Sequence, residues 1–166
     1  MDRRKFIAYL GRTAVVLTFL GQGFAYFRSL IPNTLYEPPK KFKLGYPKDY
    51  PEGITFVAKY RIFLVREGKS FWVISAICQH LGCTVNIVPP KTEVVKIKGE
   101  EFRQKWEFFC PCHGSAYYGD GTFYGGPAPK SLPWYKLDIG PDGQLVVDTN
   151  TEVDHKFRLV VEDLGG

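Results

Sequence analysis

Two short segments hold all four cysteines and two of the three histidines of this 166-residue chain. The first is Cys78–Cys83 (CQHLGC) and the second is Cys110–Ser115 (CPCHGS). Thiolate and imidazole groups are the side chains that bind zinc and iron in proteins. In each segment a glycine follows the histidine closely, and glycine lets the backbone approach a bound centre. The chain is therefore expected to fold so that two loops face one metal site.

The six Cys and His side chains can divide in two ways. Zinc binds four N or S ligands in tetrahedral geometry, but zinc sites commonly pair their cysteines as Cys-x-x-Cys, and such a site would leave two cysteines unused here. In the second division, one Cys and one His from each segment form a four-ligand set, namely Cys78, His80, Cys110 and His113. Cys83 and Cys112 would then form a disulfide between the segments, which suits an exported protein. The residues alone leave both divisions open.

Short apolar stretches rich in β-branched and aromatic residues predict strands after residue 31. They cover residues 54–65, 71–77, 92–98, 102–109, 134–139, 145–147 and 156–161. Turn-forming residues separate several of them, at Glu67–Lys69, around Gly99 and at Gly140–Gly143. No convincing helical period occurs in this part. The sequence predicts an all-β, antiparallel body in which loops at strand ends present the two Cys/His segments.

The net charge of +5 is unevenly distributed along the chain. Residues 1–48 contain nine Lys or Arg and two acidic residues, whereas residues 49–166 contain 13 basic and 15 acidic residues. A nucleic-acid-binding protein carries a basic stripe on its folded domain. The nearly neutral body therefore predicts no nucleic-acid partner, and the basic excess belongs to the N-terminal arm.

The first 31 residues have the pattern of a membrane anchor. Basic residues 3–5 precede a stretch without formal charge over residues 13–27. Arg28 can extend its charged end to the interface, which lets the span run on to Ile31 and reach a workable length. Basic residues before the span predict a cytoplasmic N-terminus and a body on the outer, periplasmic side of a bacterial cytoplasmic membrane.

The basic start of the arm also resembles a twin-arginine export signal, which directs folded proteins across that membrane. The match covers Arg3–Ile7 (RRKFI) and departs from the pattern at Asp2. The sequence offers no clear cleavage site, so we expect the anchor to be retained. The expected organisation is an anchor over residues 1–31, a Pro-rich tether over residues 32–48 and a globular domain over residues 49–166.

The two Cys/His segments resemble the cluster-binding motifs of the Rieske iron–sulfur proteins. Members of that family bind one 2Fe–2S cluster with two cysteines on one iron and two histidines on the other. Transferred by position, the resemblance assigns Cys78 and Cys110 to the first iron and His80 and His113 to the second. It also implies the Cys83–Cys112 disulfide and a Rieske-type antiparallel β-sandwich with a small cluster-binding subdomain, preceded here by one transmembrane helix.

The resemblance extends to residues that adjust and cover the cluster. Replacing two thiolates by imidazoles raises the reduction potential to roughly −150 to +300 mV, against about −400 mV for all-cysteine clusters. Ser115 and Tyr117 match the family's hydrogen-bond donors to a bridging sulfide and to a ligand cysteine, which raise the potential further. A proline loop that covers the cluster is expected at Gly126, Pro127, Ala128 and Pro129. Leu81 is expected beside the exposed histidines, where it would contact a quinol-binding partner.

The resemblance implies an electron-transfer subunit of an oxidoreductase rather than a stand-alone catalyst. The first hypothesis is the Rieske subunit of a cytochrome bc-type complex, which oxidises quinol with a cytochrome b-type subunit and passes electrons to a c-type cytochrome. The alternative is the small subunit of an arsenite oxidase-type molybdoenzyme. A cytosolic ferredoxin of a ring-hydroxylating dioxygenase is disfavoured, because that class lacks the disulfide and the anchor.

Several residues are expected to have no part in the centre. His155 lies in a charged stretch and is interpreted as a surface histidine. Trp72, Trp106 and Trp134 are in or beside predicted strands and are assigned to the core or its rim. The 26 residues between Cys83 and Cys110 form a long interval for this family, which predicts an additional contact surface.

Overall fold

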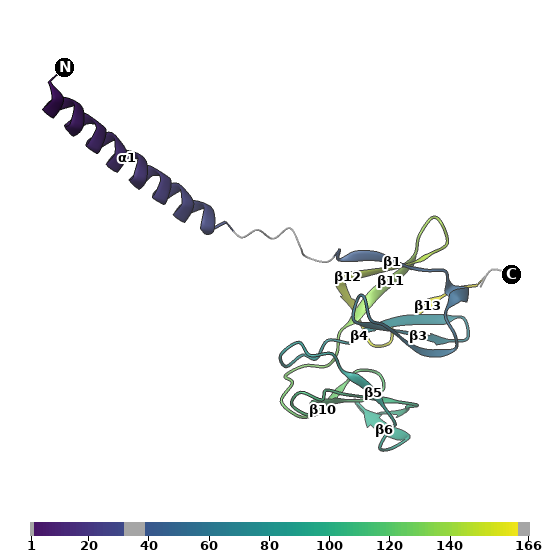
Figure 1. Ribbon diagram of the computed structural model, residues 1–166. Helices are drawn as coiled ribbons and strands as arrows, with labels where there is room; N and C mark the ends of the chain where they lie inside the picture. The colour runs from purple at the N-terminus through teal and green to yellow at the C-terminus, as the bar shows by residue number, and fades with distance from the viewer. Residues whose placement is uncertain (1, 32–38, 163–166) are drawn as a thin grey trace. The chain divides into compact units, whose positions relative to one another are not determined.

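The computed structural model describes residues 2–31 and 39–162. It divides into two compact units, Met1–Pro38 and Pro39–Gly166 (Figure 1). The first unit contains the helix α1 (Arg3–Ser29). The second contains a short 3-10 helix at Pro47–Asp49 and the strands β1 (Lys41–Gly45), β2 (Gly53–Val57), β3 (Ile62–Glu67), β4 (Ser70–Ser75), β5 (Asn86–Val88), β6 (Val94–Ile97), β7 (Glu100–Arg103), β8 (Glu107–Phe109), β9 (Ala116–Tyr117), β10 (Phe123–Gly125), β11 (Trp134–Ile139), β12 (Leu145–Val153) and β13 (Leu159–Val160).

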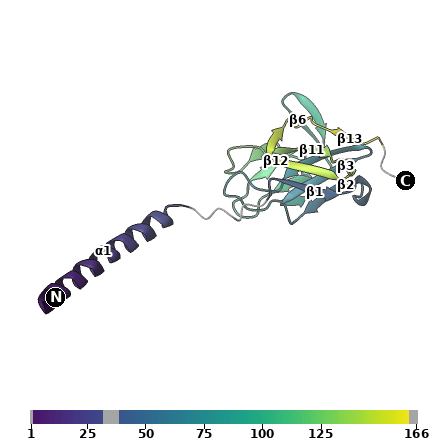
Figure 2. The ribbon, with the colours of Figure 1, turned by 90° about the horizontal axis from the view of Figure 1, so that it is seen from above.

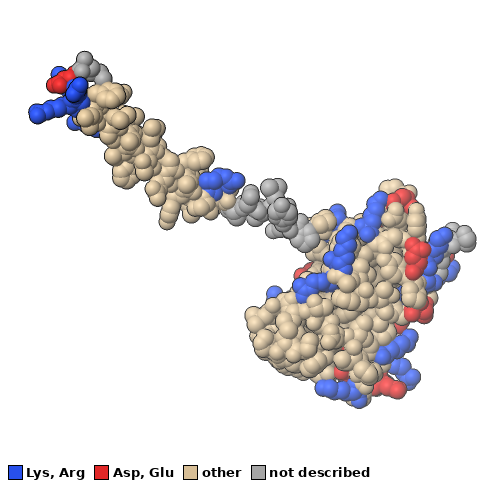
Figure 3. Space-filling view, viewed as in Figure 1, with Lys and Arg blue, Asp and Glu red and all other residues tan. Residues whose placement is uncertain are grey.

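The helix α1 is long and apolar enough to cross a membrane, by length and composition. Its 27 residues extend over roughly 40 Å at ~1.5 Å per residue, and a bilayer core is ~30 Å thick. None of its residues is buried in the structure. On the face seen in Figure 3, its charged side chains lie at the two ends. These properties agree with the expected transmembrane helix.

Antiparallel strand pairs build the whole body, as the sequence predicts. A seven-stranded sheet has the order β1-β12-β11-β4-β3-β2, and β13 pairs with β4. A four-stranded sheet has the order β10-β9-β8-β5, and β6 and β7 form a separate hairpin. In Figure 1 the four-stranded sheet and the hairpin lie at one end of the body, and Figure 2 shows the strands of the large sheet from above. The smaller sheet is the expected subdomain beside the larger one.

Strands β3 and β4 are buried on both faces, which explains their continuous apolar sequence. Their side chains alternate between two cores. Phe63, Val65, Trp72 and Ile74 belong to the core that also contains Cys78, Cys110 and Tyr117. Their neighbours Ile62, Leu64, Phe71 and Val73 belong to a second core with β11 and β12. The first Cys/His segment therefore begins directly after the most deeply buried strand pair of the described body.

Two of the expected strands are each divided in the structure. The stretch 54–65 forms β2 and β3, joined by a turn over residues 58–61. The stretch 102–109 contributes to β7 and β8, because the chain between them leaves the strand path where Gln104 is buried. Both expectations of a single strand were wrong. The first turn was missed because it contains no Gly, Pro, Asn or Asp.

The compact body begins earlier than the expected boundary at residue 49. Strand β1 pairs with β12 in the register Phe42–Val147, and Phe42 is buried. Lys41–Gly45 is thus part of the large sheet, although the sequence suggested a tether there. Residues 32–38 of the expected tether lie outside the described residues.

Candidate metal centre

The two Cys/His loops have the same backbone hydrogen bonds. In the first loop, Cys78 N–H donates to Cys83 O (2.8 Å) and Gly82 N–H donates to Cys78 O (3.0 Å). In the second, Cys110 N–H donates to Ser115 O (2.8 Å) and Gly114 N–H donates to Cys110 O (3.0 Å). Gly82 and Gly114 both have φ of +77°, in the left-handed region that glycine adopts at low cost. The glycines are therefore needed for the shape of each loop.

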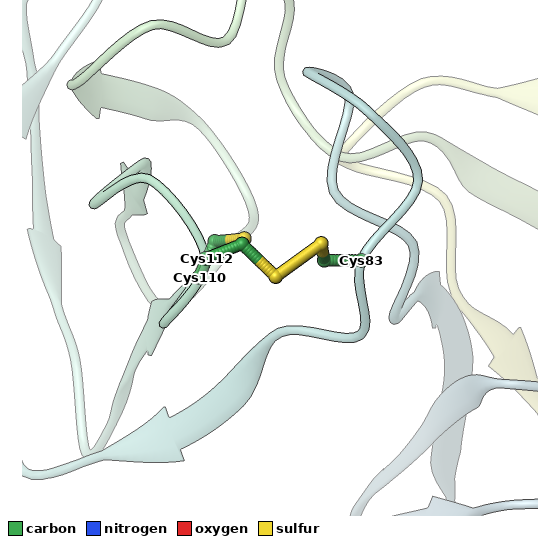
Figure 4. Close-up of side chains that lie close together, drawn as sticks. All are labelled: Cys83, Cys110 and Cys112. Atoms are coloured by element: carbon green, nitrogen blue, oxygen red, sulfur yellow. A yellow bond between two sulfur atoms is a disulfide. The ribbon is translucent and has the colours of Figure 1, made fainter.

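A disulfide joins the two loops. Cys83 and Cys112 are bonded to each other, while Cys78 and Cys110 are free and buried. Figure 4 shows the bond running from one loop to the other, with Cys110 beside Cys112. The sulfur atoms of Cys83, Cys110 and Cys112 all lie within 4.8 Å of one another. Only Cys110 of these three retains a thiol, so this group by itself cannot hold a metal.

The two histidines of the motifs face each other. The rings of His80 and His113 lie 4.9 Å apart between centroids and are nearly perpendicular, at 87°. The Nδ1 atom of His80 is buried, and no described residue offers it a hydrogen bond. His113 is exposed. The loops therefore bring two imidazoles and two free thiols to one end of the body.

The hydroxyl group of Tyr117 contacts the first loop. It lies 3.3 Å from Cys78 Sγ, and Gln79 N–H donates to it at 3.2 Å. Because the hydroxyl oxygen accepts from Gln79, its own hydrogen is free to point toward the sulfur. Tyr117 is fully buried, so this O–H group is held in place by packing. Sequence reasoning anticipated Tyr117 as a donor but not the contribution of the Gln79 backbone.

These contacts shift the pKa of the buried thiols in opposite directions. Burial raises the pKa of Cys78, but hydrogen bonds from Tyr117 and from the backbone at His80 outweigh it, so the pKa lies below its ordinary value. Burial raises the pKa of Cys110, and the adjacent Cys78 raises it further. The pKa of Tyr117 is raised by burial and by its bond to Cys78. The tyrosine therefore remains a hydrogen-bond donor beside the sulfur.

Two buried polar atoms fit a bound group at this place. Ser115 Oγ and His80 Nδ1 have no hydrogen-bond partner among the described residues. A buried hydroxyl or imidazole nitrogen without a partner is costly and calls for an explanation. Two thiols and two imidazoles are the ligands that a 2Fe–2S cluster with mixed Cys and His ligands requires, and a free hydroxyl can donate a hydrogen bond to its sulfur. The residues present therefore fit such a cluster.

The segment expected to cover the centre packs closely on the second loop. Gly126 has φ of +95°, and a Cβ atom there would lie 2.6 Å from Gly114 O and 2.6 Å from Ser115 Cα. Ala128 is buried in the core that contains both free cysteines. Pro127 and Pro129 are exposed. The glycine is required for this close approach, and the prolines face outward beside the loops.

The loops themselves contribute no charged side chains to the surface. Segments 70–90, 108–119 and 121–129 contain no Asp, Glu, Lys or Arg. Leu81 is 70% exposed at this end. Figure 3 shows an extended uncharged area on the corresponding part of the body. An exposed apolar residue within an uncharged surface is a common feature of a docking site.

The long interval 84–109 is fixed to the body by buried polar groups. Gln104 donates to Glu107 (2.7 Å) and accepts from the backbone of Gly119 (3.0 Å). Tyr124 donates to the other oxygen of Glu107 (2.7 Å), and Trp106 donates to Gly119 O (3.1 Å). The hairpin β6–β7 beyond them is largely exposed, and Glu100 on it pairs with Lys156 (3.0 Å). No pattern in the sequence identified Gln104 or Glu107 as buried anchors.

His155 is not the surface residue that was expected. Its Nδ1 atom lies 3.6 Å from Asp120 Oδ2, and its ring stacks on Trp134 with centroids 5.2 Å apart. Trp72 stacks on Trp134 in turn, and Arg158 lies over both indoles, so these tryptophans belong to the core as expected. The carboxylate and the indole together explain why the histidine is partly buried. It takes no part in the centre.

Comparison with known proteins agrees with this geometry. The model of the Rieske [2Fe-2S] domain matches residues 40–136, more than half of the chain. This chain therefore belongs to the Rieske [2Fe–2S] family, and its cofactor is one 2Fe–2S cluster. The match includes both Cys/His loops, the disulfide and the proline loop.

Among the curated proteins, the relatives include iron–sulfur subunits of cytochrome b6-f complexes. The subunit of Chlorobaculum tepidum is 33% identical over 119 residues, which is 66% of this chain and 58% of that protein. The chloroplast subunit of Chlamydomonas reinhardtii is 35% identical over 72% of this chain and 51% of that protein. The chain thus spans little more than half the length of these relatives.

Solved structures that resemble the chain are also Rieske proteins. The plasma membrane Rieske protein of Synechocystis PCC 6803 is 24% identical, with a TM-score of 0.39, over 64% of this chain and 97% of that chain. The soluble domain of Rieske protein II from Sulfolobus acidocaldarius is 18% identical, with a TM-score of 0.40, over 70% of this chain and 80% of that chain.

Proposed function

We propose that this chain is the Rieske electron-transfer subunit of a cytochrome bc-type complex. In that complex it would take electrons from quinol bound at a cytochrome b-type subunit and pass them to a c-type cytochrome. The observation that carries the proposal is the meeting of two free buried cysteines and two facing histidines beside the inter-loop disulfide. The names of the relatives, which are subunits of cytochrome b6-f complexes, support the choice of complex.

The proposed ligands are Cys78 and Cys110 for one iron and His80 and His113 for the other. The bound cluster supplies the capacity to accept and return one electron. The buried thiols supply the ligands of the inner iron. His80 has an unpartnered inward Nδ1, and His113 is exposed, so the histidine side is the one that a partner can reach.

The surrounding residues adjust the affinity for the electron. Tyr117 donates toward Cys78 Sγ, and the unpartnered hydroxyl of Ser115 is available to a second sulfur. Hydrogen bonds to sulfur stabilise the additional negative charge of the reduced state and so raise the potential. The proposed role of both residues is therefore to keep the potential in the upper part of the Rieske range.

The uncharged end of the body is the proposed docking surface. Leu81 is 70% exposed there, and Pro127 and Pro129 lie exposed on the covering loop. Apolar contact with a membrane-embedded cytochrome b-type subunit would exclude water from the quinol beside His80 and His113. The segment Gly126–Pro129 would close a further side of the centre, with its exposed prolines at the edge of this docking surface.

The proposed location is the outer side of a cytoplasmic membrane. The helix α1 supports a single-pass anchor, and the basic residues in its first turn favour a cytoplasmic N-terminus. The proposed organisation keeps the anchor over residues 1–31 and a Pro-rich tether between it and the body. Such a tether would let the body move between two electron-transfer partners.

The test is an EPR-monitored redox titration of the protein extracted from membranes, together with identification of the proteins that purify with it. The expected result is a reduced-state signal of a Cys/His-ligated 2Fe–2S cluster with a potential between roughly −150 and +300 mV. A b-type haem protein should purify with it, and the preparation should oxidise quinol. Co-purification with a molybdenum-containing subunit instead would favour the arsenite oxidase-type alternative.

Ligand variants test the residue assignment. His113→Ala and Cys110→Ser should abolish the cluster signal, because each removes one of the four proposed ligands. His155→Ala is the matched control, since it removes the third histidine of the chain outside the centre. A colourless protein that contains zinc, or a cluster that survives loss of His113, would contradict the proposal.

A further inference from the structure

The turn between β2 and β3 contains an arginine in an unusual conformation. Arg61 has φ of +52°, in the left-handed region that disfavours every residue with a Cβ atom. Lys98, in the turn between β6 and β7, is the other non-glycine residue of the described part with positive φ, at +50°. Glycine follows Lys98 but not Arg61. A strained residue that persists in a turn is a reason to look for a function of its side chain.

The contacts of Arg61 lead to the first Cys/His loop. Its guanidinium donates through Nη2 to the carbonyl of Gly82 and through Nε to the hydroxyl of Thr84 (3.0 Å). Its own carbonyl accepts from the backbone of Ala76 (2.9 Å). Arg61 thus forms hydrogen bonds with residues on both sides of Cys78, and these bonds connect the two ends of the first loop.

A short series of hydrogen bonds connects this arginine to the proposed ligand. The carbonyl of Gly82 accepts from Arg61, and the N–H of Gly82 donates to the carbonyl of Cys78 (3.0 Å). Cys78 in turn donates to Cys83, the residue of the disulfide (2.8 Å). A movement of the guanidinium is therefore transmitted to the backbone that carries Cys78. The second loop is supported differently, by the close approach of Gly126 to Gly114.

We propose that Arg61 is a positioning residue for the iron–sulfur centre, an inference that rests on the proposed ligands Cys78 and His80. It holds the first loop in its cluster-binding shape from the neighbouring hairpin. Its positive charge also favours the reduced cluster, which carries one more negative charge than the oxidised cluster. The backbone of Arg61 adopts the strained left-handed conformation, and in this conformation its guanidinium contacts Gly82 and Thr84.

The alternative is that Arg61 only shapes the turn. Glycine would then serve at least as well, because it adopts positive φ without strain. The variant Arg61→Gly separates these two roles, since it keeps the turn and removes the guanidinium. Lys98→Gly is a matched control, because it removes a positive charge and a Cβ atom at nearly the same φ in a hairpin away from the first loop.

The experiment compares the two variants in the full chain extracted with its cluster. Thermal unfolding, hydrogen exchange of residues 76–84, EPR g-values and midpoint potential are measured. Lys98→Gly should unfold at a temperature equal to or above that of the unaltered protein, and Arg61→Gly should remain folded with a temperature no higher than that of Lys98→Gly. Only Arg61→Gly should show about tenfold faster exchange at the first loop, because it loses two hydrogen bonds from a charged donor. Only this variant should show shifted g-values and a lower potential.

Two further variants divide the role of the arginine. Arg61→Lys keeps the positive charge but has a single donor group. Compared with Arg61→Gly, it should recover most of the midpoint potential, but hydrogen exchange at the first loop should remain fast. Thr84→Val removes one acceptor of Arg61 and leaves the positive charge of Arg61 in place. Hydrogen exchange at residues 76–84 should therefore become faster, while the midpoint potential stays unchanged. If Arg61→Gly matches Lys98→Gly in exchange, g-values and potential, Arg61 is only a turn residue.

The outcome is distinguishable from failure of the proposed function. If the unaltered protein carries no 2Fe–2S signal, the functional proposal fails by itself. The exchange of residues 76–84 still reports whether Arg61 holds the loop in the disulfide-bonded chain. Equal exchange in the two glycine variants would overturn the positioning role in that case too.

Discussion

At the scale of single residues, the Tyr117 hydroxyl is the clearest means of adjusting the centre. It accepts from Gln79 N–H and lies 3.3 Å from Cys78 Sγ. Tyr117→Phe removes the donor and leaves the ring in its buried position. We expect a potential lower by on the order of 40–60 mV, if the bond is about 1 kcal/mol stronger to the reduced state. A redox titration measures this directly.

Tyr118→Phe is the control for this change. Tyr118 is the next residue, and its ring stacks on Tyr124 with centroids 4.4 Å apart. Loss of its hydroxyl should leave the potential unchanged. An unaltered potential in Tyr117→Phe would show that the hydroxyl does not act on the sulfur.

A second residue-scale prediction concerns Asp120 and acid stability. Burial raises the pKa of Asp120, but the nearby imidazole of His155 and hydrogen bonds from Thr122 outweigh it, so the pKa lies below its ordinary value. A carboxylate with a lowered folded-state pKa adds stability that is fully present above about pH 4 and is lost as the pH falls through the folded-state pKa. Asp120→Asn should therefore lower the free energy of unfolding by about 1–3 kcal/mol at pH 7.

The difference between the two proteins should shrink as the pH falls below about 4. Thermal unfolding across this pH range is the measurement. Asp138→Asn, which removes a carboxylate that is 56% exposed, is the control and should change stability little at any pH. A difference that stays constant from pH 7 to pH 3 would contradict the role of the charged carboxylate.

Residues with a recognisable motif could be predicted from the sequence, and those held by tertiary contacts could not. The free and bonded cysteines divide as the Rieske resemblance implies, whereas the residues alone left a zinc site open. The position of His155 was misread, because the carboxylate of Asp120 and the indole of Trp134 lie far from it in the sequence. Burial of that kind depends on strand pairing, which local composition does not encode.

At the scale of elements, the covering loop depends on Gly126. Gly126→Ala adds a Cβ atom 2.6 Å from Gly114 O and also imposes a side chain at φ of +95°. Both effects push the covering loop away from the second Cys/His loop. We expect a loss of about 2–4 kcal/mol in unfolding free energy and reduced cluster content, measured by iron per chain after purification.

Gly143→Ala separates backbone strain from the clash. Gly143 has φ of +76°, and the nearest atom to an added Cβ lies 3.9 Å away. This control should cost only about 1 kcal/mol and should keep its iron. Equal iron content in the two variants would mean that the covering loop tolerates displacement.

The strand pattern of the body could be predicted where turns have ordinary chemistry. The strand Trp134–Ile139 and its turn at Gly140–Gly143 follow from composition and are found as expected. The turn before Ile62 was missed because Arg61 occupies the position where glycine is usual. A turn maintained by contacts to another loop leaves no local signal in the sequence.

At the scale of the whole molecule, the proposed export of the body would depend on the N-terminal unit. If the arm is a twin-arginine signal, changing both Arg3 and Arg4 to Lys should block transfer of the body across the membrane. The charge is preserved, so the result depends on the guanidinium groups themselves. Protease protection of the body in cells stripped of their outer envelope is the measurement.

Changing Arg12 and Arg28 to Lys is the matched control, because it alters two other arginines of the same helix. This pair should leave the body accessible from outside. A body that is exported equally in both double variants would exclude the twin-arginine route. Export in the folded state would suit a cluster that is inserted before the body crosses the membrane.

The shared hydrogen-bond pattern of the two Cys/His loops has a consequence for assembly. Each loop closes with its own backbone bonds between residues no more than five positions apart, so neither loop depends on the other for these bonds. The disulfide joins the two loops, and the proposed cluster ligands would join them a second time. Such a design tolerates insertions between the loops, and the long stretch from residue 84 to residue 109 occupies that permissive interval.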